Sequence, residues 1–440
     1  MKKAAHHNCD HILRGTLWHC RSSSPTKPLF EEITDGALAI DEHGKILDVG
    51  KAVKIKKKFK AKKETIFKES ILLPGFVDTH IHFPQMNQIG CHGESLLGWL
   101  EKYIYPEEIR MSHPKQARHF APLFFQELFQ NGTTTSMVLS SSDSRSTETL
   151  FQSAKALGAR TVIGKVSMDR LAPKELIRKV SEDRETSEEL ISRWHGKENR
   201  LFYALTPRFS PACSQPLLTL LGDLAQKHPS LRIQTHFSEN LDEIKLVHRL
   251  FPKAKDYLQT YEDFGLLGNR TVLAHCIHPT SREVQRMAEL GVHISHCPTS
   301  NLFLGSGLFP MNDYLEKKIN LSIGTDVGAG TSFSLWTTLG AAYKIQRLRQ
   351  RDVSTAQLFY LATLGGAKAL GMEKEIGNFE VGKQADIQVI NWMTKPILKS
   401  RMENSQSALE RFFSCLFHFE KDLVEAVFVG GKKVFTRAAH

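Results

Sequence analysis

Short apolar runs alternate with amphipathic stretches through the middle of the chain, between residues 71 and 375. Eight runs have the composition of strands: ILLPGFVDTH, TTTSMVLS, TVIGKVSM, LFYALTPRF, RIQTHF, TVLAHC, VHISHCP and LSIGTD. Helical patterns separate them, as in APLFFQELFQNG, which ends at Gly132, and TSREVQRMAELG, where Thr280 and Glu283 have the spacing of a capping box. Eight such alternations predict an α/β fold, a (β/α)8 barrel. A doubly wound sheet is the alternative, but no Gly-x-Gly-x-x-Gly motif follows the first run.

Both ends of the chain have a different pattern, in which short β-rich runs are separated by turns. The N-terminal runs include GALAIDEHGKILDVG, with a hairpin turn predicted at DEHGK, and ETIFKESILL. The C-terminal runs include GNFEVGKQADIQVINW and LVEAVFVGGKKVF. Neither end is long enough to bury a core alone. We therefore expect the two ends to pair into one small β domain, which would bring the termini together.

The composition is that of an ordinary globular protein, with a basic bias. The 440 residues include 58 Lys and Arg against 47 Asp and Glu, a formal net charge of +11. Eight lysines lie within residues 51–63, KAVKIKKKFKAKK, where arginines and stacking aromatics are scarce. This composition favours a solvated surface over a nucleic-acid site. No apolar run is long enough to span a membrane, and the N-terminus lacks the apolar region of a signal peptide.

Seven cysteines are scattered along the chain, and no two of them form a Cys-x-x-Cys pair. Their odd number and their spacing argue against a disulfide framework and against a cysteine zinc finger. Zinc deaminases that act on nucleic acids carry a Pro-Cys-x-x-Cys motif, so the sequence disfavours that class as well. We expect a cytoplasmic protein that binds neither nucleic acid nor membrane.

Polar side chains gather where three of the predicted strands end. His80 and His82 lie at the end of the first strand, His236 ends the fifth and Asp326 ends the eighth. The carboxyl ends of all barrel strands open on one face, and strand residues two apart point the same way. A lone buried histidine is usually a hydrogen-bonded core residue, but four such residues together predict a metal site. Imidazole nitrogens with one carboxylate suit Zn²⁺ or Fe²⁺, with one position left for water.

Two more residues lie near these strand ends. Glu239, three residues after His236, is placed to move protons between a bound water and a leaving group. The alternative is an acid that serves the N-terminus of the next helix. His275 ends the sixth strand and could hydrogen-bond the water or polarise the carbon under attack. The alternative is a packing histidine.

The motifs PGFVDTHIHF, THFSEN, LAHC, SHCPTSN and GTDVGAG together resemble the deaminase branch of the amidohydrolase superfamily. The resemblance implies a (β/α)8 TIM-like barrel over residues 73–375 and a small β-sandwich formed by residues 1–72 and 376–440. It also implies one Zn²⁺ per chain, with Fe²⁺ as the less favoured ion, held by His80, His82, His236 and Asp326. Related enzymes with two metals use a lysine on the fourth strand. Here LFYALTPRF has none and Lys165 falls in the third strand, which favours one ion.

Within that branch the chain resembles the guanine deaminases, through LLGWLEKYIYPEE, VIGKVSMDR and TPRFSPACS. The resemblance implies that the purine is held by Gln85, Arg208, Phe209, His236, Glu239, His275 and Asp326. Phe209 can stack on a flat purine, Arg208 can donate to O6, and Gln85 offers both a donor and an acceptor. Taken singly, each residue has a more ordinary interpretation. Phe209 would be a core aromatic, Arg208 would belong to a surface ion pair and Gln85 would cap a turn.

The reaction that the resemblance implies is hydrolysis of guanine to xanthine and ammonia, with Glu239, His275 and Asp326 as the catalytic residues. Metal-activated water attacks C2, Glu239 protonates N3, His275 orients the nucleophile and Asp326 accepts the proton of the water. One alternative is a related hydrolase of 8-oxoguanine, an adenosyl nucleoside, a triazine or a pterin. Another is a non-catalytic scaffold on the same barrel.

Two further expectations concern the cover of the site and the assembly. Trp99 and the aromatic-rich residues 96–106 are expected to cover the site as a lid, the alternative being an ordinary packing helix. Asn301, in HCPTSN, is expected to fix a loop rather than to act in catalysis. A homodimer is expected, because two-fold dimers are the commonest closed assembly.

Overall fold

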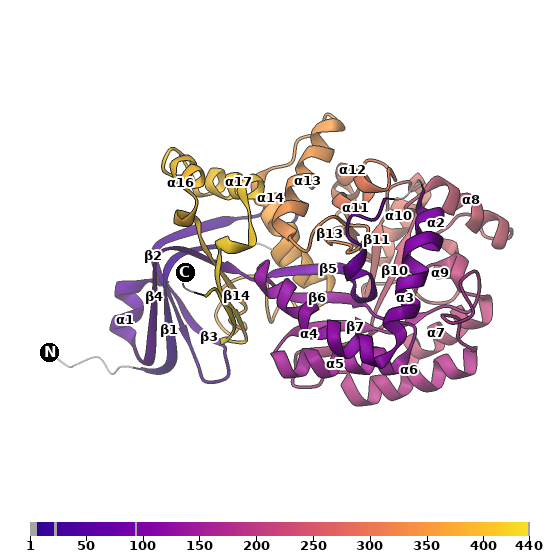
Figure 1. Ribbon diagram of the computed structural model, residues 1–440. Coiled ribbons are helices and arrows are strands. Elements are labelled where there is room, and N and C mark those ends of the chain that lie inside the picture. Colours follow the sequence, from indigo (N-terminus) through magenta and orange to yellow (C-terminus); the bar gives the residue numbers. More distant parts are fainter. Residues whose placement is uncertain (1–6, 22–23, 93–94, 439–440) are drawn as a thin grey trace. The chain divides into compact units, whose positions relative to one another are not determined.

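The computed structural model describes residues 7–21, 24–92 and 95–438, and the chain divides into two compact units. The sheet unit comprises Met1–Val77, Gln126–Thr134 and Val353–His440. The barrel unit comprises Asp78–Phe125 and Thr135–Asp352. In Figure 1 the sheet unit is mostly indigo and yellow, whereas the barrel unit runs from purple to orange.

Eight strands form the barrel, in the order β5, β6, β7, β9, β10, β11, β12 and β13. Their bounds are Phe76–His82, Thr133–Leu139, Arg160–Gly164, Leu201–Pro207, Arg232–Phe237, Thr271–His275, His293–His296 and Asn320–Ile323, and the short β8, Val166–Ser167, pairs with β9. From β6 to β13, neighbouring strands run parallel. The predicted α/β barrel is therefore confirmed.

One strand boundary differs from the prediction. Residues 71–74 belong to β4, Phe59–Pro74, which lies in the other sheet, and β5 begins only at Phe76. Gly75 separates the two strands, and a Cβ there would come within 2.1 Å of the Thr134 side chain. Because only glycine allows so close an approach, the chain can pass from one sheet to the other at this point.

Helices follow the barrel strands and surround them in Figure 1. They are α4 Pro114–Gln130, α5 Ser144–Leu157, α6 Val180–Trp194, α7 Gln215–Lys227, α8 Leu241–Leu250, α9 Gln259–Glu262, α10 Ser281–Leu290, α11 Pro298–Phe303, α12 Met311–Glu316 and α13 Leu335–Leu348. The predicted capping box of α10 is confirmed, since the Thr280 hydroxyl accepts from the Glu283 backbone and Glu283 accepts from the Thr280 backbone. Helix α4 ends two residues before Gly132, which has a φ of +79°.

The two ends of the barrel's strand order meet. The backbone nitrogen of Asp326, beyond β13, donates to the carbonyl of His80 on β5 at 2.8 Å. The buried carboxylate of Asp78 accepts from the Thr325 backbone at 3.1 Å and from its hydroxyl at 2.5 Å. These bonds join the first and last strands of the barrel across 247 residues of sequence.

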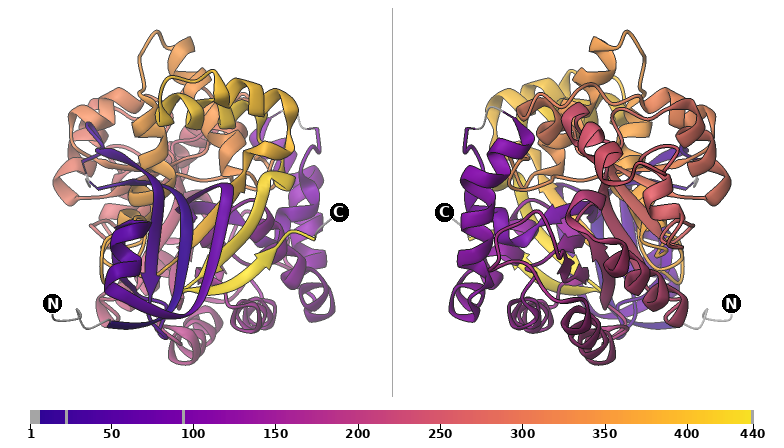
Figure 2. Two further views of the ribbon diagram at one scale, coloured as in Figure 1. Left: turned by 90° about the vertical axis from the view of Figure 1, so that its left-hand side faces the viewer. Right: turned by 90° about the vertical axis from the view of Figure 1, so that its right-hand side faces the viewer.

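Strands from both ends of the chain form the seven-stranded sheet of the sheet unit, and Figure 2 (left) shows the indigo and yellow strands side by side. The order is β16, β15, β14, β4, β1, β2, β3; β1 and β4 run parallel, and the other neighbours run antiparallel. Besides β4, the strands are β1 His7–Cys20, β2 Phe30–Ile40, β3 Ile46–Lys51, β14 Ile387–Asn391, β15 Val424–Val429 and β16 Lys432–Thr436. The expected pairing of the two chain ends is thus confirmed, with β14 against β4 as the junction.

The seven-stranded sheet curls over one apolar core. Leu38 of β2, Ile46 of β3, Leu72 of β4, Val389 of β14 and Phe428 of β15 belong to the same buried cluster. Strands from opposite ends of the order therefore face each other, as in a small β-sandwich. The helices of this unit are α1 Ala52–Lys58, α14 Thr355–Tyr360, α15 Gly366–Ala369, α16 Pro396–Glu403 and α17 Ala408–His418.

The lysine-rich residues 51–63 comprise the end of β3, the helix α1 and the start of β4. Lys56 pairs with Glu64 at 2.9 Å, and Lys58 pairs with Asp48 at 2.6 Å. Neighbouring acids thus neutralise part of this charge on an exposed surface, where such pairs contribute little stability. Within the described ranges, the chain has no helix both long and apolar enough to cross a membrane.

A fully buried ion pair lies between β7 and α6. Lys165 follows β7, and its amino group lies 2.7 Å from Asp183 of α6, with each side chain 1% exposed. The Ser167 hydroxyl donates to the second oxygen of Asp183 at 2.9 Å. The amino group of Lys165 is therefore bound to Asp183, in agreement with its predicted place outside the metal site.

We expect Lys165→Met to destabilise the protein by about 3–5 kcal/mol, because it leaves Asp183 charged and unpaired in the interior. The double variant Lys165→Met with Asp183→Asn should lose less of the free energy of unfolding, since no buried charge remains. Urea unfolding followed by circular dichroism measures both free energies. A double variant at least as unstable as the single one would rule out the buried charge as the cause.

Candidate active site

Four potential metal ligands converge at the carboxyl ends of the barrel strands. His80 and His82 lie two residues apart on β5, so both side chains point to the same side of the strand. His236 lies on β10, and Asp326 follows β13. One ligand atom of each residue lies within 4.8 Å of the other three. The structure thus brings together the four residues that the sequence analysis selected.

The spacing of these atoms fits a single metal ion. Nε2 of His82 lies 3.3 Å from Nε2 of His80 and 3.2 Å from Nε2 of His236. Oδ1 of Asp326 lies 3.2 Å from Nε2 of both His80 and His82. Ligands that lie about 2.0–2.1 Å from a tetrahedral Zn²⁺ are roughly 3.3–3.4 Å apart. Three imidazoles and one carboxylate at this spacing form a suitable site for one metal ion.

The surroundings hold these groups in the states that a metal requires. The Arg208 carbonyl lies 2.6 Å from Nδ1 of His236, and because a carbonyl only accepts, Nδ1 carries the proton and Nε2 is free to ligate. Burial lowers the pKa of His80 to about 4 and that of His236 well below its usual value. Burial would raise the pKa of Asp326, but the neighbouring imidazoles hold it well below the usual range.

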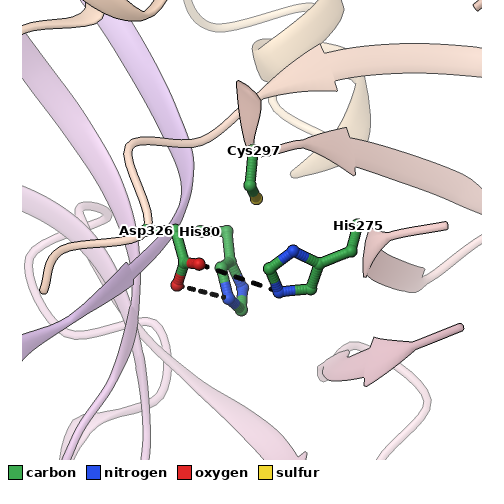
Figure 3. A group of neighbouring side chains, drawn as sticks. All are labelled: His80, His275, Cys297 and Asp326. Atoms are coloured by element: carbon green, nitrogen blue, oxygen red, sulfur yellow. Dashed lines mark ion pairs between the residues drawn. The ribbon is translucent and has the colours of Figure 1, made fainter. Parts of the chain in front are cut away.

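A second group of potential ligands shares two residues with the first (Figure 3). His80, His275, Cys297 and Asp326 each offer an atom within 4.8 Å of the others. This group is looser, since Nε2 of His275 lies 3.8 Å from Asp326 and the Cys297 thiol is directed to the Ser295 carbonyl at 3.6 Å. Burial also raises the pKa of the Cys297 thiol, which opposes metal binding. The group with three histidines is therefore the better metal site.

Glu239 faces the cavity from the loop between β10 and α8. The cap of α8 is formed by the neighbouring Asn240 and Glu243, so Glu239 is not the residue that caps this helix. Its carboxylate accepts from the Ser306 hydroxyl at 3.2 Å and lies 3.5 Å from Nε2 of His275. Burial raises the pKa of Glu239 to about 7. The group can therefore both hold and release a proton near neutral pH.

His275 is held with one ring nitrogen free. Nδ1 lies 2.9 Å from the amide oxygen of Asn301, an acceptor, so Nδ1 carries a proton. Among the described residues no hydrogen-bond partner contacts Nε2, although the atom is buried beside Glu239 and Asp326. An unpartnered buried nitrogen at this place suits a contact with a water or a substrate. The side chain of Asn301, a residue expected to fix a loop, thus contacts His275 and orients its ring.

Four residues at these strand ends have a left-handed backbone. Ser238, His275, Cys276 and Asp326 have φ values of +52°, +70°, +51° and +53°. Such values are uncommon outside glycine and cost about 1–3 kcal/mol each. The bends occur where the strands end, and His275 and Asp326 both line the cavity. Backbone strain is thus concentrated where the candidate catalytic groups are presented.

The three residues predicted to hold a purine lie beside the metal ligands. Gln85 belongs to the 3-10 helix η1, Phe83–Gln88, after β5, and its amide nitrogen lies 3.1 Å from Nδ1 of His82. Arg208 and Phe209 follow β9. All three are buried and line one cavity with His82, His236, Glu239, His275 and Asp326. Arg208 is therefore a buried cavity residue, not a surface ion pair.

The sequence analysis did not select Glu108. This buried residue of α3, Tyr105–Ser112, lies 2.5 Å from Nη1 of Arg208 and accepts from the amide of Gln85 at 3.0 Å. The ring of Tyr105, on the same helix, lies 5.3 Å from the Arg208 guanidinium. In the sequence Glu108 is one of two adjacent acids in a first helical turn, which is an ordinary surface pattern.

The segment expected to be a lid forms one wall of the cavity. Leu96 and Trp99 of α2, Leu96–Trp99, and Leu100 of η2, Leu100–Ile104, line the cavity and pack in one apolar cluster with Phe209. The Trp99 indole donates to the Cys91 carbonyl at 2.9 Å. The segment therefore lines the cavity with the apolar face that it packs against Phe209, and its role as a lid stays a prediction.

Comparison with known proteins agrees with this architecture. The family model described as "Amidohydrolase family" matches residues 71–434. A guanine deaminase of Escherichia coli is 41% identical over 371 residues, 84% of each chain. A solved structure of E. coli guanine deaminase has a TM-score of 0.94 at 38% identity, covering 97% of this chain and 100% of that one.

A second solved structure adds a ligand. The guanine deaminase of C. acetobutylicum, with guanine bound in its active site, has a TM-score of 0.89 at 32% identity. It covers 97% of this chain, and this chain covers all of it. The resemblance stated from the sequence motifs is thus confirmed over nearly the full length. The chain belongs to the amidohydrolase family.

Proposed function

We propose that this enzyme hydrolyses guanine to xanthine and ammonia. The observation that carries the proposal is one cavity that joins the histidine and aspartate metal group to Gln85, Arg208 and Phe209. The first set suits activation of water, and the second suits a flat heterocycle with a carbonyl and an amide edge. The relatives that match along most of the chain are guanine deaminases, and one of them holds guanine.

We propose Zn²⁺ as the metal, held by His80, His82, His236 and Asp326. We favour zinc over Fe²⁺ because three imidazole nitrogens and one carboxylate oxygen gathered around one point suit Zn²⁺, which can take up a water molecule as a further ligand. When bound, the ion lowers the pKa of a water molecule and so supplies a nucleophile near neutral pH.

The proton transfers fall to residues of the chain itself. Glu239, with its pKa raised to about 7, donates a proton to N3 of guanine as water adds to C2. Asp326 takes one proton from the attacking water and passes it to the departing amino group. Glu239 recovers a proton from the added hydroxyl group as the C2–N bond breaks and the C2 carbonyl forms. His275, held by Asn301, orients the nucleophile through its free Nε2. The products are xanthine and ammonia.

The purine is held by contacts of three kinds. The ring of Phe209 stacks on one face of the base. The Arg208 guanidinium donates to O6. The Gln85 amide contacts the adjacent edge of the base, which carries both hydrogen-bond donors and acceptors. These contacts fix C2 near the metal group, which reduces the entropic part of the barrier.

We further propose a cytoplasmic homodimer that acts on a small-molecule purine in purine catabolism or salvage. All seven cysteines are free thiols, and six of them are buried, which supports a reducing compartment. Two-fold dimers are the commonest closed assembly of such chains. Chromatography with light scattering measures the assembly.

The proposed reaction predicts that metal-loaded enzyme releases ammonia from guanine and forms xanthine. Glu239→Gln should lower kcat about 10²–10⁴-fold, because the group that protonates N3 is lost, while the metal content stays unchanged. Ammonia release and purine absorbance together measure the rate.

Asp242→Asn is the matched control, since this exposed acid at the start of α8 loses the same charge outside the cavity. No turnover of guanine by metal-loaded wild-type enzyme would refute the proposed substrate. The related amino-heterocycles would then be assayed. A fully active Glu239→Gln would refute only the role of that residue.

The proposed metal group predicts that His236→Ala loses the bound ion. Cys297→Ser should retain it, because the thiol belongs only to the looser group in Figure 3. Mass-spectrometric metal analysis after dialysis gives the ion content per chain for each variant. Metal retained by His236→Ala but lost by Cys297→Ser would place the ion in the other group.

A further inference from the structure

Glu108 connects the two polar residues that the proposed function places against the purine edge. One carboxylate oxygen lies 2.5 Å from Nη1 of Arg208, and the other accepts from the amide nitrogen of Gln85 at 3.0 Å. The Arg208 and Glu108 side chains are 4% and 7% exposed. Both oxygens of this carboxylate are therefore used, and both partners are residues of the candidate binding site.

The contact with Glu108 sets the orientation of the Gln85 amide. A carboxylate only accepts hydrogen bonds, so the amide must turn its nitrogen toward Glu108. From another element, the backbone nitrogen of Gly328 donates to the Gln85 oxygen at 3.3 Å. These two contacts oppose a flip of the amide. The amide nitrogen also lies 3.1 Å from Nδ1 of His82, so the protein holds the Gln85 amide in one place beside the cavity.

Glu108 also determines the charge at the purine edge. Arg208 is buried, and the Glu108 carboxylate lies against its guanidinium. The ring of Tyr105 covers the guanidinium from the same helix. Arg208 and Glu108 thus form a neutral pair that still offers donors to a carbonyl oxygen.

We propose that Glu108 is a positioning residue that orients Gln85 and Arg208 and keeps the purine edge of the pocket electrically neutral, so that neutral guanine is favoured over anionic xanthine. This inference rests on the proposed function. Guanine is uncharged near neutral pH, whereas xanthine loses a proton there. An arginine without its carboxylate partner would attract that anion, and product would then leave the site less readily.

The test uses two substitutions of Glu108 and one of its neighbour. Glu108→Gln removes the charge and leaves one acceptor for two partners. Glu108→Asp keeps the charge on a shorter side chain. Glu107→Gln is the matched control, because Glu107 precedes Glu108 on α3 but pairs with Arg110 and Asn87.

We expect Glu108→Gln to lower kcat/KM for guanine about tenfold or more, mostly through KM, since the groups affected bind the base rather than transfer protons. Xanthine should inhibit this variant more strongly than the wild type at mildly alkaline pH, where xanthine is mostly the monoanion. Glu108→Asp should also lose kcat/KM but should bind xanthine no more tightly than the wild type. Glu107→Gln should match the wild type in both measurements.

Equilibrium dialysis of xanthine gives a readout that does not depend on turnover, and metal analysis and circular dichroism confirm an intact site and fold. Unchanged kcat/KM in Glu108→Gln, xanthine binding that fails to strengthen, or an equal effect in Glu107→Gln would each overturn the inference. If Glu108→Gln does not fold, wild-type kcat/KM in Glu108→Asp would overturn the positioning role. Failure of the proposed function is distinct, because metal-loaded wild-type enzyme would then not turn over guanine.

Discussion

The site depends on the closure of the barrel between its first and last strands. His80 and His82 lie on β5 and Asp326 lies beyond β13, so these ligands meet only when the two strands are adjacent. Backbone bonds from Asp326 to His80 and from His82 to Val327 hold them there, at 2.8 and 2.9 Å. The distances between the ligand atoms follow from these strand contacts, so the metal group is part of the fold itself.

Much of this arrangement could be predicted from sequence, because residues at the carboxyl ends of barrel strands all lie on one face of the barrel. A His-x-His pair at one strand end and a histidine at another must share a face once the fold is a barrel. His80, His82 and His236 lie together as expected because each lies near the carboxyl end of a barrel strand. The strand boundary at residues 71–74 was wrong because two strands follow each other with only Gly75 between them.

Glu108 and Asn301 could not be predicted in the same way. Each acts on a residue distant in sequence, 100 residues away for Glu108 with Arg208 and 26 for Asn301 with His275. The sequence around each residue does not distinguish it from a residue outside the site. Glu107, the neighbour of Glu108, is also a glutamate in the first turn of α3. Periodicity reports which side of a helix is buried, but it does not report which polar group will meet another across the barrel.

The left-handed residues at the strand ends limit the positions at which substitutions can stabilise the protein. Ser238, His275, Cys276 and Asp326 hold conformations that glycine adopts without strain, yet two of them carry side chains that line the cavity. At these two positions a substitution to glycine would relieve the backbone strain but would remove the side chain that lines the cavity. Substitutions that raise thermal stability are therefore expected away from these strand ends, for example in the apolar core of the sheet unit.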